Sequence, residues 1–199
     1  MFPDLTRDDV FRIETGRLWL RWPMAKDAGA ILRLAGDPAV AEMTARIPHP
    51  LPRAEVDAFL LRARTENAAG TGLTLALARR SAPAELVGIV GIVAGEAEPE
   101  PELGYWLGQP HWGGGLMREA VAALLDAYFA YAGGAVVAAS ARTDNPASRR
   151  LLERCGFVRT VVATRPCPAR GGVTVDLFRL ERARWLGSAT TGPGAARAA

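Results

Sequence analysis

A run of three glycines, Gly113-Gly114-Gly115, stands between a predicted strand, Glu102–Leu107, and the strongest predicted helix of the chain, residues 116–131. Glycine lets a backbone approach a ligand closely, and the start of a helix offers unpaired N–H groups and a positive dipole end. Arg118 adds a positive charge in the first helical turn. This stretch therefore predicts a cradle for a phosphate or a pyrophosphate.

Two common phosphate-binding motifs fit the glycine run poorly. A dinucleotide-binding fingerprint would place G-x-G-x-x-G after an early strand of a βαβ unit, whereas this turn follows several strands with an antiparallel pattern. A P-loop would need Gly-Lys-Ser or Gly-Lys-Thr, which the sequence lacks. Two alternatives rest on the glycines alone: a flexible loop without a ligand, and a nucleotide-binding regulatory domain.

Periodicity and turn residues predict a mixed sheet with helices around it, an α/β (α+β) fold. Strands are expected at residues 17–22, 72–78, 86–93, 102–107, 135–141, 157–164 and 173–180. Helices are expected at 25–35, 53–67, 116–131 and 145–154, with a short one after Asp37-Pro38. The order of strands and helices differs from the strict alternation of a doubly wound sheet.

The length of 199 residues suits one domain. We expect it over residues 14–186, after a lead-in at 1–13. Residues 187–199 are small, polar or rich in proline and glycine, and are expected to be disordered.

Composition bounds the function. The 24 basic residues, almost all arginine, are balanced by 21 acidic ones, so nucleic-acid binding is not indicated, although arginine suits a local phosphate site. No stretch reaches the ~18 uncharged apolar residues of a membrane span, and the first residues lack the apolar core of a signal peptide, so we expect a cytoplasmic protein without membrane contact. Two histidines and two cysteines, Cys155 and Cys167, predict no metal site and reduced, packed thiols.

Three segments, in this order, carry a resemblance to a known family: ELGYWL at 102–107, HWGGGLMREAV at 111–121, which contains the glycine run, and RTDNPASRRLLERCGF at 142–157. They resemble the GNAT acetyltransferase superfamily, and are most similar to the subgroup of ribosomal-protein N-terminal acetyltransferases, the RimJ/RimL type. The opening ETGRLWLRW, the loop PHPLPRAEVDAFL and the closing VDLFRLERARW also resemble that subgroup. The resemblance covers the chain from about Glu14 to Trp185.

This resemblance implies a GNAT fold: a central, mixed, mostly antiparallel sheet of six to seven strands, with splayed central strands and about four flanking helices. It implies acetyl-CoA as cosubstrate, with its pyrophosphate on the glycine turn and its pantetheine arm between strands 102–107 and 135–141. In the family's pyrophosphate signature, Trp112 replaces the usual Gln or Arg, and Met117 replaces the final small residue. The residues expected to bind the cosubstrate are Tyr105, Trp106, Leu107, Trp112, Gly113, Gly114, Gly115, Leu116, Met117, Arg118, Asn145, Ser148 and Arg149.

Glu102 and Ser148 are the candidate catalytic residues. Attack on a thioester needs a neutral amine, and an N-terminal α-amine, with a pKa of ~7.7–8.0, is neutral far more often than a lysine with a pKa of ~10.4. Glu102 is the candidate base, directly or through water; its alternative is a solvated residue at a strand start. The resemblance places Ser148 near the sulfur, where a weakly acidic hydroxyl suits a hydrogen-bond donor to the departing thiolate. The alternative is that Asn145 only caps its helix and Ser148 is incidental.

His49, in a proline-rich loop bordering the expected acceptor groove, and Asp176, an anion on the last strand, are the candidate acceptor contacts. The expected acceptor is a primary amine: a peptide N-terminus, a small amine or an aminoglycoside-like drug. A non-catalytic acyl-CoA-binding module or sensor is the alternative from another class. A homodimer is one option for its assembly.

Overall fold

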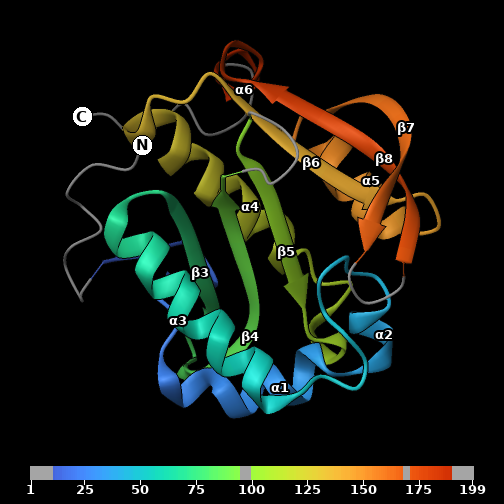
Figure 1. Ribbon diagram of the computed structural model, residues 1–199. Coiled ribbons are helices and arrows are strands. Elements are labelled where there is room, and N and C mark those ends of the chain that lie inside the picture. The colour runs from blue at the N-terminus through green and yellow to red at the C-terminus, as the bar shows by residue number, and fades with distance from the viewer. Residues whose placement is uncertain (1–10, 95–99, 168–170, 190–199) are drawn as a thin grey trace.

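The computed structural model describes residues 11–94, 100–167 and 171–189 (Figure 1). These parts contain one sheet of eight strands in the order β1-β2-β3-β4-β5-β6-β8-β7. Every neighbouring pair is antiparallel except β5 and β6, which are parallel. The strands are β1 Arg12–Glu14, β2 Leu18–Arg21, β3 Gly72–Arg79, β4 Ala82–Val93, β5 Glu102–Leu107, β6 Val136–Arg142, β7 Val158–Cys167 and β8 Gly171–Glu181.

Helices cover both faces of this sheet (Figure 1). The helical elements are η2 Ala25–Asp27, α1 Ala28–Ala35, α2 Pro38–Ala41, α3 Arg53–Ala69, η3 Gln109–His111, α4 Leu116–Ala127, the π-helical turn η4 Tyr128–Ala132, α5 Pro146–Arg154 and α6 Arg182–Ala189. Apolar side chains of α1 and α3 pack with β3 and β4 in one cluster. Those of α4 and α5 form the larger cluster on the opposite face.

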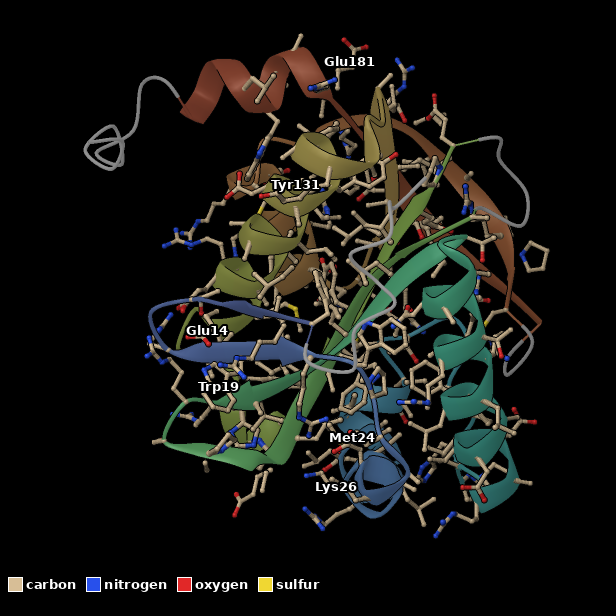
Figure 2. The ribbon with its side chains drawn as sticks, turned by 90° about the vertical axis from the view of Figure 1, so that its left-hand side faces the viewer. Glu14, Trp19, Met24, Lys26, Tyr131 and Glu181 are labelled. Atoms are coloured by element: carbon tan, nitrogen blue, oxygen red, sulfur yellow. The ribbon has the colours of Figure 1, made fainter. Side chains whose placement is uncertain are left out.

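The predicted mixed, mostly antiparallel sheet is confirmed, with one strand more than expected. The extra strand is β1, which pairs with β2 in an antiparallel hairpin where Glu14 lies opposite Trp19 (Figure 2). The sequence places this strand at the border of the lead-in, because three residues are too few to show a period of two. Residues 1–10 of that lead-in lie outside the described parts.

The described chain also has six α-helices where about four were expected. Helix α6 continues through Ala189, three residues into the segment predicted to be disordered. Residues 190–199 of that segment lie outside the described parts. The predicted helix at 116–131 is found as α4 followed by a π-helical turn, and Gly133, with a φ of 64°, ends it.

The two parallel strands separate soon after they begin, as the resemblance implied. Within the described residues, β5 and β6 pair only as Glu102↔Ala138 and Leu103↔Ala139. The remaining part of β5, from residue 104 to 107, is bonded to β4 on one side only. A gap therefore opens between the ends of the two strands, in the middle of the sheet.

Side chains of β5 alternate between the two faces of the sheet. Leu103, Tyr105 and Leu107 lie on the face of α4, where they join the larger cluster. Trp106 lies on the other face and packs against the cluster of α1 and α3. The gap can thus be reached by side chains of β5 from both faces.

Candidate active site

The glycine turn forms an open cradle at the start of α4. Gly113 and Gly115 have φ values of 78° and 73°, a region that favours glycine. A Cβ atom built on Gly113 or Gly114 would meet no heavy atom of the described residues within 4 Å, so this loop borders open space in that part of the chain. Across the described chain, the N–H groups of these three glycines have no backbone partner and are available to an anion.

Glu119, in the first turn of α4, fastens the cradle to the segment before β2. Its Oε1 accepts hydrogen bonds from Thr15 Oγ1 at 2.6 Å and from the Arg17 N–H at 2.8 Å, and its Oε2 lies 2.6 Å from Arg17 Nε. Arg17 Nη1 also donates to the Gly114 carbonyl at 2.7 Å. Burial raises the pKa of Glu119, but the bonds from Thr15 and Arg17 outweigh it and the pKa is lowered. The charged carboxylate therefore holds the loop in place.

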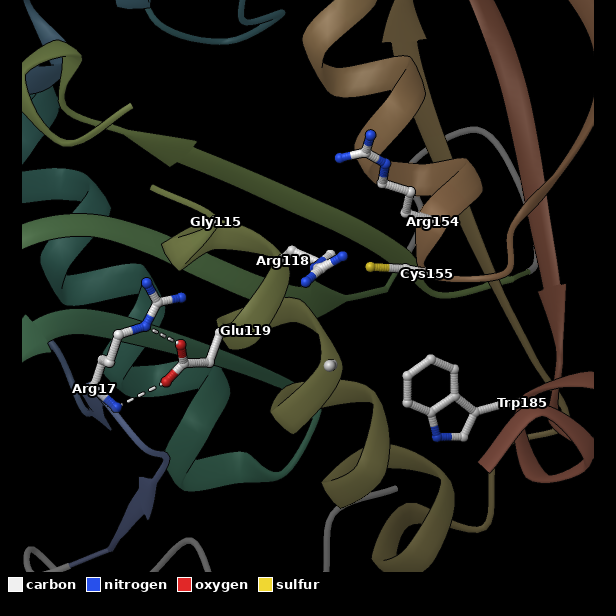
Figure 3. Close-up of a pocket in the computed structure, with 8 residues that line it drawn as sticks. Arg17, Gly115, Arg118, Glu119, Arg154, Cys155 and Trp185 are labelled. Carbon is white, nitrogen blue, oxygen red and sulfur yellow. Dashed lines mark hydrogen bonds and ion pairs between the residues drawn. The ribbon is translucent and has the colours of Figure 1, made fainter. Parts of the chain in front are cut away.

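A cavity of about 410 Å³ lies beside the cradle, between α4, the end of α5 and α6 (Figure 3). Its lining residues are Arg17, Gly115, Arg118, Glu119, Ala122, Arg154, Cys155 and Trp185. Three of them are arginines, and only Arg17 is paired with the single acid of the lining, Glu119. Arg118 and Arg154 have no acidic partner within the described ranges, so the cavity carries a positive charge suited to phosphates.

Trp185 and Cys155 form two further parts of the cavity wall. Trp185 Nε1 donates to Asp126 Oδ1 at 2.9 Å, which fixes the indole of α6 against α4. Arg118 reaches toward Cys155 (Figure 3). Burial raises the pKa of Cys155 to about 11, although Arg118 opposes this rise. The thiol is therefore neutral at physiological pH and poorly suited to be a nucleophile.

Ser148 and Tyr105 meet on the α4 and α5 face of the sheet, next to the gap. Ser148 Oγ lies 2.7 Å from the Tyr105 hydroxyl. Asn145 Oδ1 accepts from the Ser148 N–H at 3.0 Å, so Asn145 is the N-cap of α5 and at the same time fixes the backbone of Ser148. Burial raises the pKa of Tyr105, with the Ser148 hydrogen bond acting against this rise, so the phenol stays protonated. The pair offers two hydroxyl groups beside the gap.

Glu102 lies on the opposite face of β5 from Tyr105, because the two residues are three positions apart and side chains of a strand alternate between its faces. Its Oε1 accepts hydrogen bonds from Ser140 Oγ at 2.9 Å and from Arg165 Nη1 at 3.1 Å. The Glu102 side chain is 20% exposed and that of Arg165 is 21% exposed, so this ion pair is half-buried. The two candidate catalytic residues thus approach the gap from different faces.

Arg149 and Asp176, for which the sequence predicted separate roles, contact each other. Asp176 is 1% exposed, since β8 turns it to the same face as Phe178, beneath α5. Arg149 Nε lies 2.8 Å from Asp176 Oδ2, an ion pair without hydrogen-bond geometry, and Arg159 Nη1 donates to Oδ1 at 3.1 Å. Asp176 is thus buried and ion-paired with two arginines, of which Arg149 is one; the acceptor role of Asp176 and the cosubstrate role of Arg149 stay predictions.

His49 contacts the end of α1, where its Nδ1 lies 2.9 Å from the Gly36 carbonyl oxygen. This contact fixes the proline-rich loop, and the residue remains exposed.

Several residues of the predicted cosubstrate site reach the gap or the cradle by their backbone only. Leu107, Leu116 and Met117 have buried side chains in the larger core cluster. Met117 therefore points into the core and away from the cradle. Trp112 is 48% exposed, and its Nε1 donates to the Leu107 carbonyl at 2.6 Å, which ties the glycine loop to the end of β5.

Sequence reasoning missed Arg17, Arg154 and Trp185 at the cavity, and Ser140 and Arg165 beside Glu102. Besides the glycine turn, the preference for arginine over lysine was the signal of a phosphate site, and it did not say which arginines take part. In the described ranges no group of three or more His, Cys, Asp or Glu side chains is placed to hold a metal ion. The described helices include none long and apolar enough to cross a membrane.

Comparison with known protein families identifies an acetyltransferase domain over most of the chain. A family model described as Acetyltransferase (GNAT) domain matches residues 17–158. A search of curated proteins found no match. Among solved structures, the acetyltransferase from Agrobacterium tumefaciens str. C58 has 22% identity and a TM-score of 0.72, over 87% of this chain and 96% of that chain.

Two further neighbours have known ligands or substrates in their descriptions. RimL, a ribosomal L7/L12 alpha-N-protein acetyltransferase, has 18% identity and a TM-score of 0.72, over 86% of this chain and 94% of that chain. The microcin C7 self-immunity acetyltransferase MccE, solved with acetyl-CoA and AMP, has 18% identity and a TM-score of 0.70, over 84% of this chain and 93% of that chain. At these identities the likeness establishes the shared fold.

Proposed function

The chain belongs to the GNAT acetyltransferase family and uses acetyl-CoA, and from this premise we propose that it acetylates a primary amine, the α-amine of a protein N-terminus. The observation that carries the proposal is the gap between β5 and β6, with the Tyr105–Ser148 pair on one face and Glu102 on the other. If a thioester lay in this gap, the hydroxyl pair could contact its leaving sulfur from one face, and the carboxylate could accept a proton from the attacking amine on the other face.

The cradle and the arginine-lined cavity fit the nucleotide end of acetyl-CoA. Free N–H groups at Gly113 to Gly115 and the start of α4 suit the pyrophosphate. Arg118 and Arg154 supply charge for further phosphate oxygens, and the indole of Trp185 offers a flat apolar surface to the adenine. The volume of about 410 Å³ lies within the range of ligand sites.

The chemistry is a direct transfer. The amine nitrogen attacks the thioester carbon, a C–N bond forms, the C–S bond breaks, and the electron pair leaves on sulfur as a thiolate. The nitrogen gives up one proton, for which Glu102 is the proposed acceptor, directly or through water. Ser148 is the proposed hydrogen-bond donor to the thiolate. No covalent enzyme intermediate is needed, in agreement with the neutral thiol of Cys155.

Charges around the gap favour an α-amine over a polycationic drug. A polycation would need an excess of free carboxylates, but the acids in this region are paired with arginines: Glu102 with Arg165, Asp144 with Arg142, and Asp176 with Arg149 and Arg159. An α-amine also has a lower pKa than a lysine side chain, so a weaker base can deprotonate it. The shared fold with RimL, which is described as an alpha-N-protein acetyltransferase, supports the same choice.

A thiol-release assay with acetyl-CoA tests the proposal. We expect turnover with peptides that have a free N-terminus, and none with the same peptides blocked at the N-terminus but carrying an internal lysine. Turnover with an aminoglycoside or a polyamine alone would move the acceptor to a small amine. Tight acetyl-CoA binding without release on any amine of the panel would instead support a non-catalytic binding module.

A further inference from the structure

We infer that Tyr105 is a positioning residue: its hydroxyl donates to Ser148 Oγ and thereby directs the single proton of Ser148 toward the leaving sulfur. Tyr105 was expected only as one of the residues that bind the cosubstrate, so this role for its side chain comes from the three-dimensional arrangement. The inference rests on the proposed function, because it assigns a partner to the hydroxyl that faces the thiolate.

The geometry leaves the two hydroxyl protons as the adjustable part of the pair. Asn145 Oδ1 holds the Ser148 N–H at 3.0 Å, and the first turn of α5 fixes its backbone. Tyr105 is held within β5, and its ring packs against the larger core cluster. What remains to be decided is which oxygen donates across the 2.7 Å contact between Tyr105 and Ser148.

A serine hydroxyl has one proton and can donate only once. If Ser148 donated to Tyr105, that proton would be unavailable to the sulfur, and among the described residues the phenol proton would have only the Ser148 carbonyl oxygen, at 3.5 Å. If Tyr105 donates to Ser148 Oγ, the phenol makes a short bond and the serine proton stays free. The phenol is also the more acidic and stronger donor of the two. Both considerations favour donation from Tyr105.

Tyr105 is a poor source of the proton itself. An ordinary phenol with a pKa of ~10 is roughly 30-fold weaker as an acid than a thiol with a pKa of ~8.5. Burial raises the pKa of Tyr105 further. Transfer of its proton through Ser148 to the thiolate is therefore unfavourable. The phenol acts by orienting Ser148, and the thiolate leaves as an anion stabilised by that serine.

A double-mutant cycle with Tyr105→Phe, Ser148→Ala and the double variant tests this role. We expect Tyr105→Phe to lower kcat roughly 3- to 30-fold, as for one lost hydrogen bond, with little change in the KM for acetyl-CoA. In the Ser148→Ala background, Tyr105→Phe should cause no further loss, because it acts through a hydroxyl that is already gone. Circular dichroism and thermal unfolding verify that each variant is folded.

A second measurement does not depend on turnover. Thiolate absorbance of bound coenzyme A, titrated with pH, reports how strongly the site stabilises the sulfur anion. Both single variants should raise the pKa of the bound thiol, and the double variant should raise it no further. Tyr128→Phe is the matched control: it removes a buried phenol oxygen that bonds to the Val136 carbonyl at 3.3 Å, and it should leave both kcat and the bound thiol pKa unchanged.

The outcomes separate the inference from the proposed function. Losses that multiply in the double variant would show that Tyr105 acts independently of Ser148 and would overturn the inference. An unchanged kcat and thiol pKa in Tyr105→Phe would overturn it as well. In both cases the wild-type protein would still bind coenzyme A and release thiol. A wild-type protein that binds no coenzyme A would overturn the proposed function and, with it, the inference.

Discussion

Gly114→Glu is the substitution that tests the phosphate cradle most directly. Gly114 is not among the glycines with positive φ, and a Cβ atom there would lie more than 4 Å from every heavy atom that the structure describes, so a side chain adds neither backbone strain nor a clash with those residues. The new carboxylate would stand in the space assigned to the pyrophosphate. Two unit charges 4 Å apart repel by ~4 kcal/mol at an effective dielectric constant of ~20.

This loop is open to solvent, so screening and side-chain movement reduce that figure to ~1–3 kcal/mol. We therefore expect Gly114→Glu to weaken acetyl-CoA binding by roughly 10- to 100-fold. The matched variant Gly114→Gln has nearly the same size without the charge and should weaken binding less than ~3-fold. Calorimetric titration at low and high salt measures both, and the difference between Glu and Gln should shrink as salt is added.

Equal affinity of Gly114→Glu and the wild type would refute the cradle, and equal weakening by Glu and Gln would show that size, not charge, decides. Gly115 gives a useful contrast because its φ of 73° is in the left-handed region. A side chain at Gly115 costs about 1–2 kcal/mol of folding stability from backbone strain alone. Variants at Gly115 should therefore lower Tm as well as affinity, whereas those at Gly114 should lower affinity only.

Three further predictions concern single residues. Glu102→Gln should reduce turnover of an α-amine peptide strongly near pH ~6.5, by up to the ~10²–10⁴-fold effect of a general base, and only mildly near pH ~8.5; a loss equal at both pH values in the pH–rate profile would contradict a role as base. Glu119→Gln should lower stability by ~1–2 kcal/mol near neutral pH through the lost bonds with Thr15 and Arg17. Because the pKa of Glu119 is lowered on folding, its contribution is present above the unfolded value of ~4.3 and is lost as pH falls through the folded value, so the Tm curves of the two proteins should converge in acid. Trp185→Ala should weaken binding of coenzyme A several-fold in calorimetry but leave binding of a pantetheine fragment unchanged; equal weakening of both ligands would place the indole elsewhere than at the adenine.

Local signals in the sequence determined most elements of the fold. The apolar residues of α4 repeat at helical spacing, and the glycines before it require a turn, so both follow from neighbours a few residues apart. Asn145 could be predicted as a helix cap for the same reason. The positions of the interior strands also follow from short apolar runs between turn residues. These features depend on contacts of short range, which the order of residues shows directly.

The residue pairs of the candidate active site depend on tertiary structure. Tyr105 meets Ser148 across 43 residues, and Thr15 meets Glu119 across 104. No local pattern encodes such contacts, because they arise only when separate strands and helices pack in one register. Asp176 shows the consequence: its place on an apolar strand was visible in the sequence, but a shift of one residue in register would turn it to the other face.

The sequence by itself thus determined the glycine turn and the strands and helices other than β1 and α6, and it showed which residue types could perform acetyl transfer. Only the tertiary structure decided that Asp176 and Arg149 neutralise each other under α5, that α6 brings Trp185 to the cavity, and that a tyrosine of β5 holds the serine of α5. The physical reason is that propensity and periodicity act within a few residues, whereas charge pairing and burial are set by which faces meet when the chain folds.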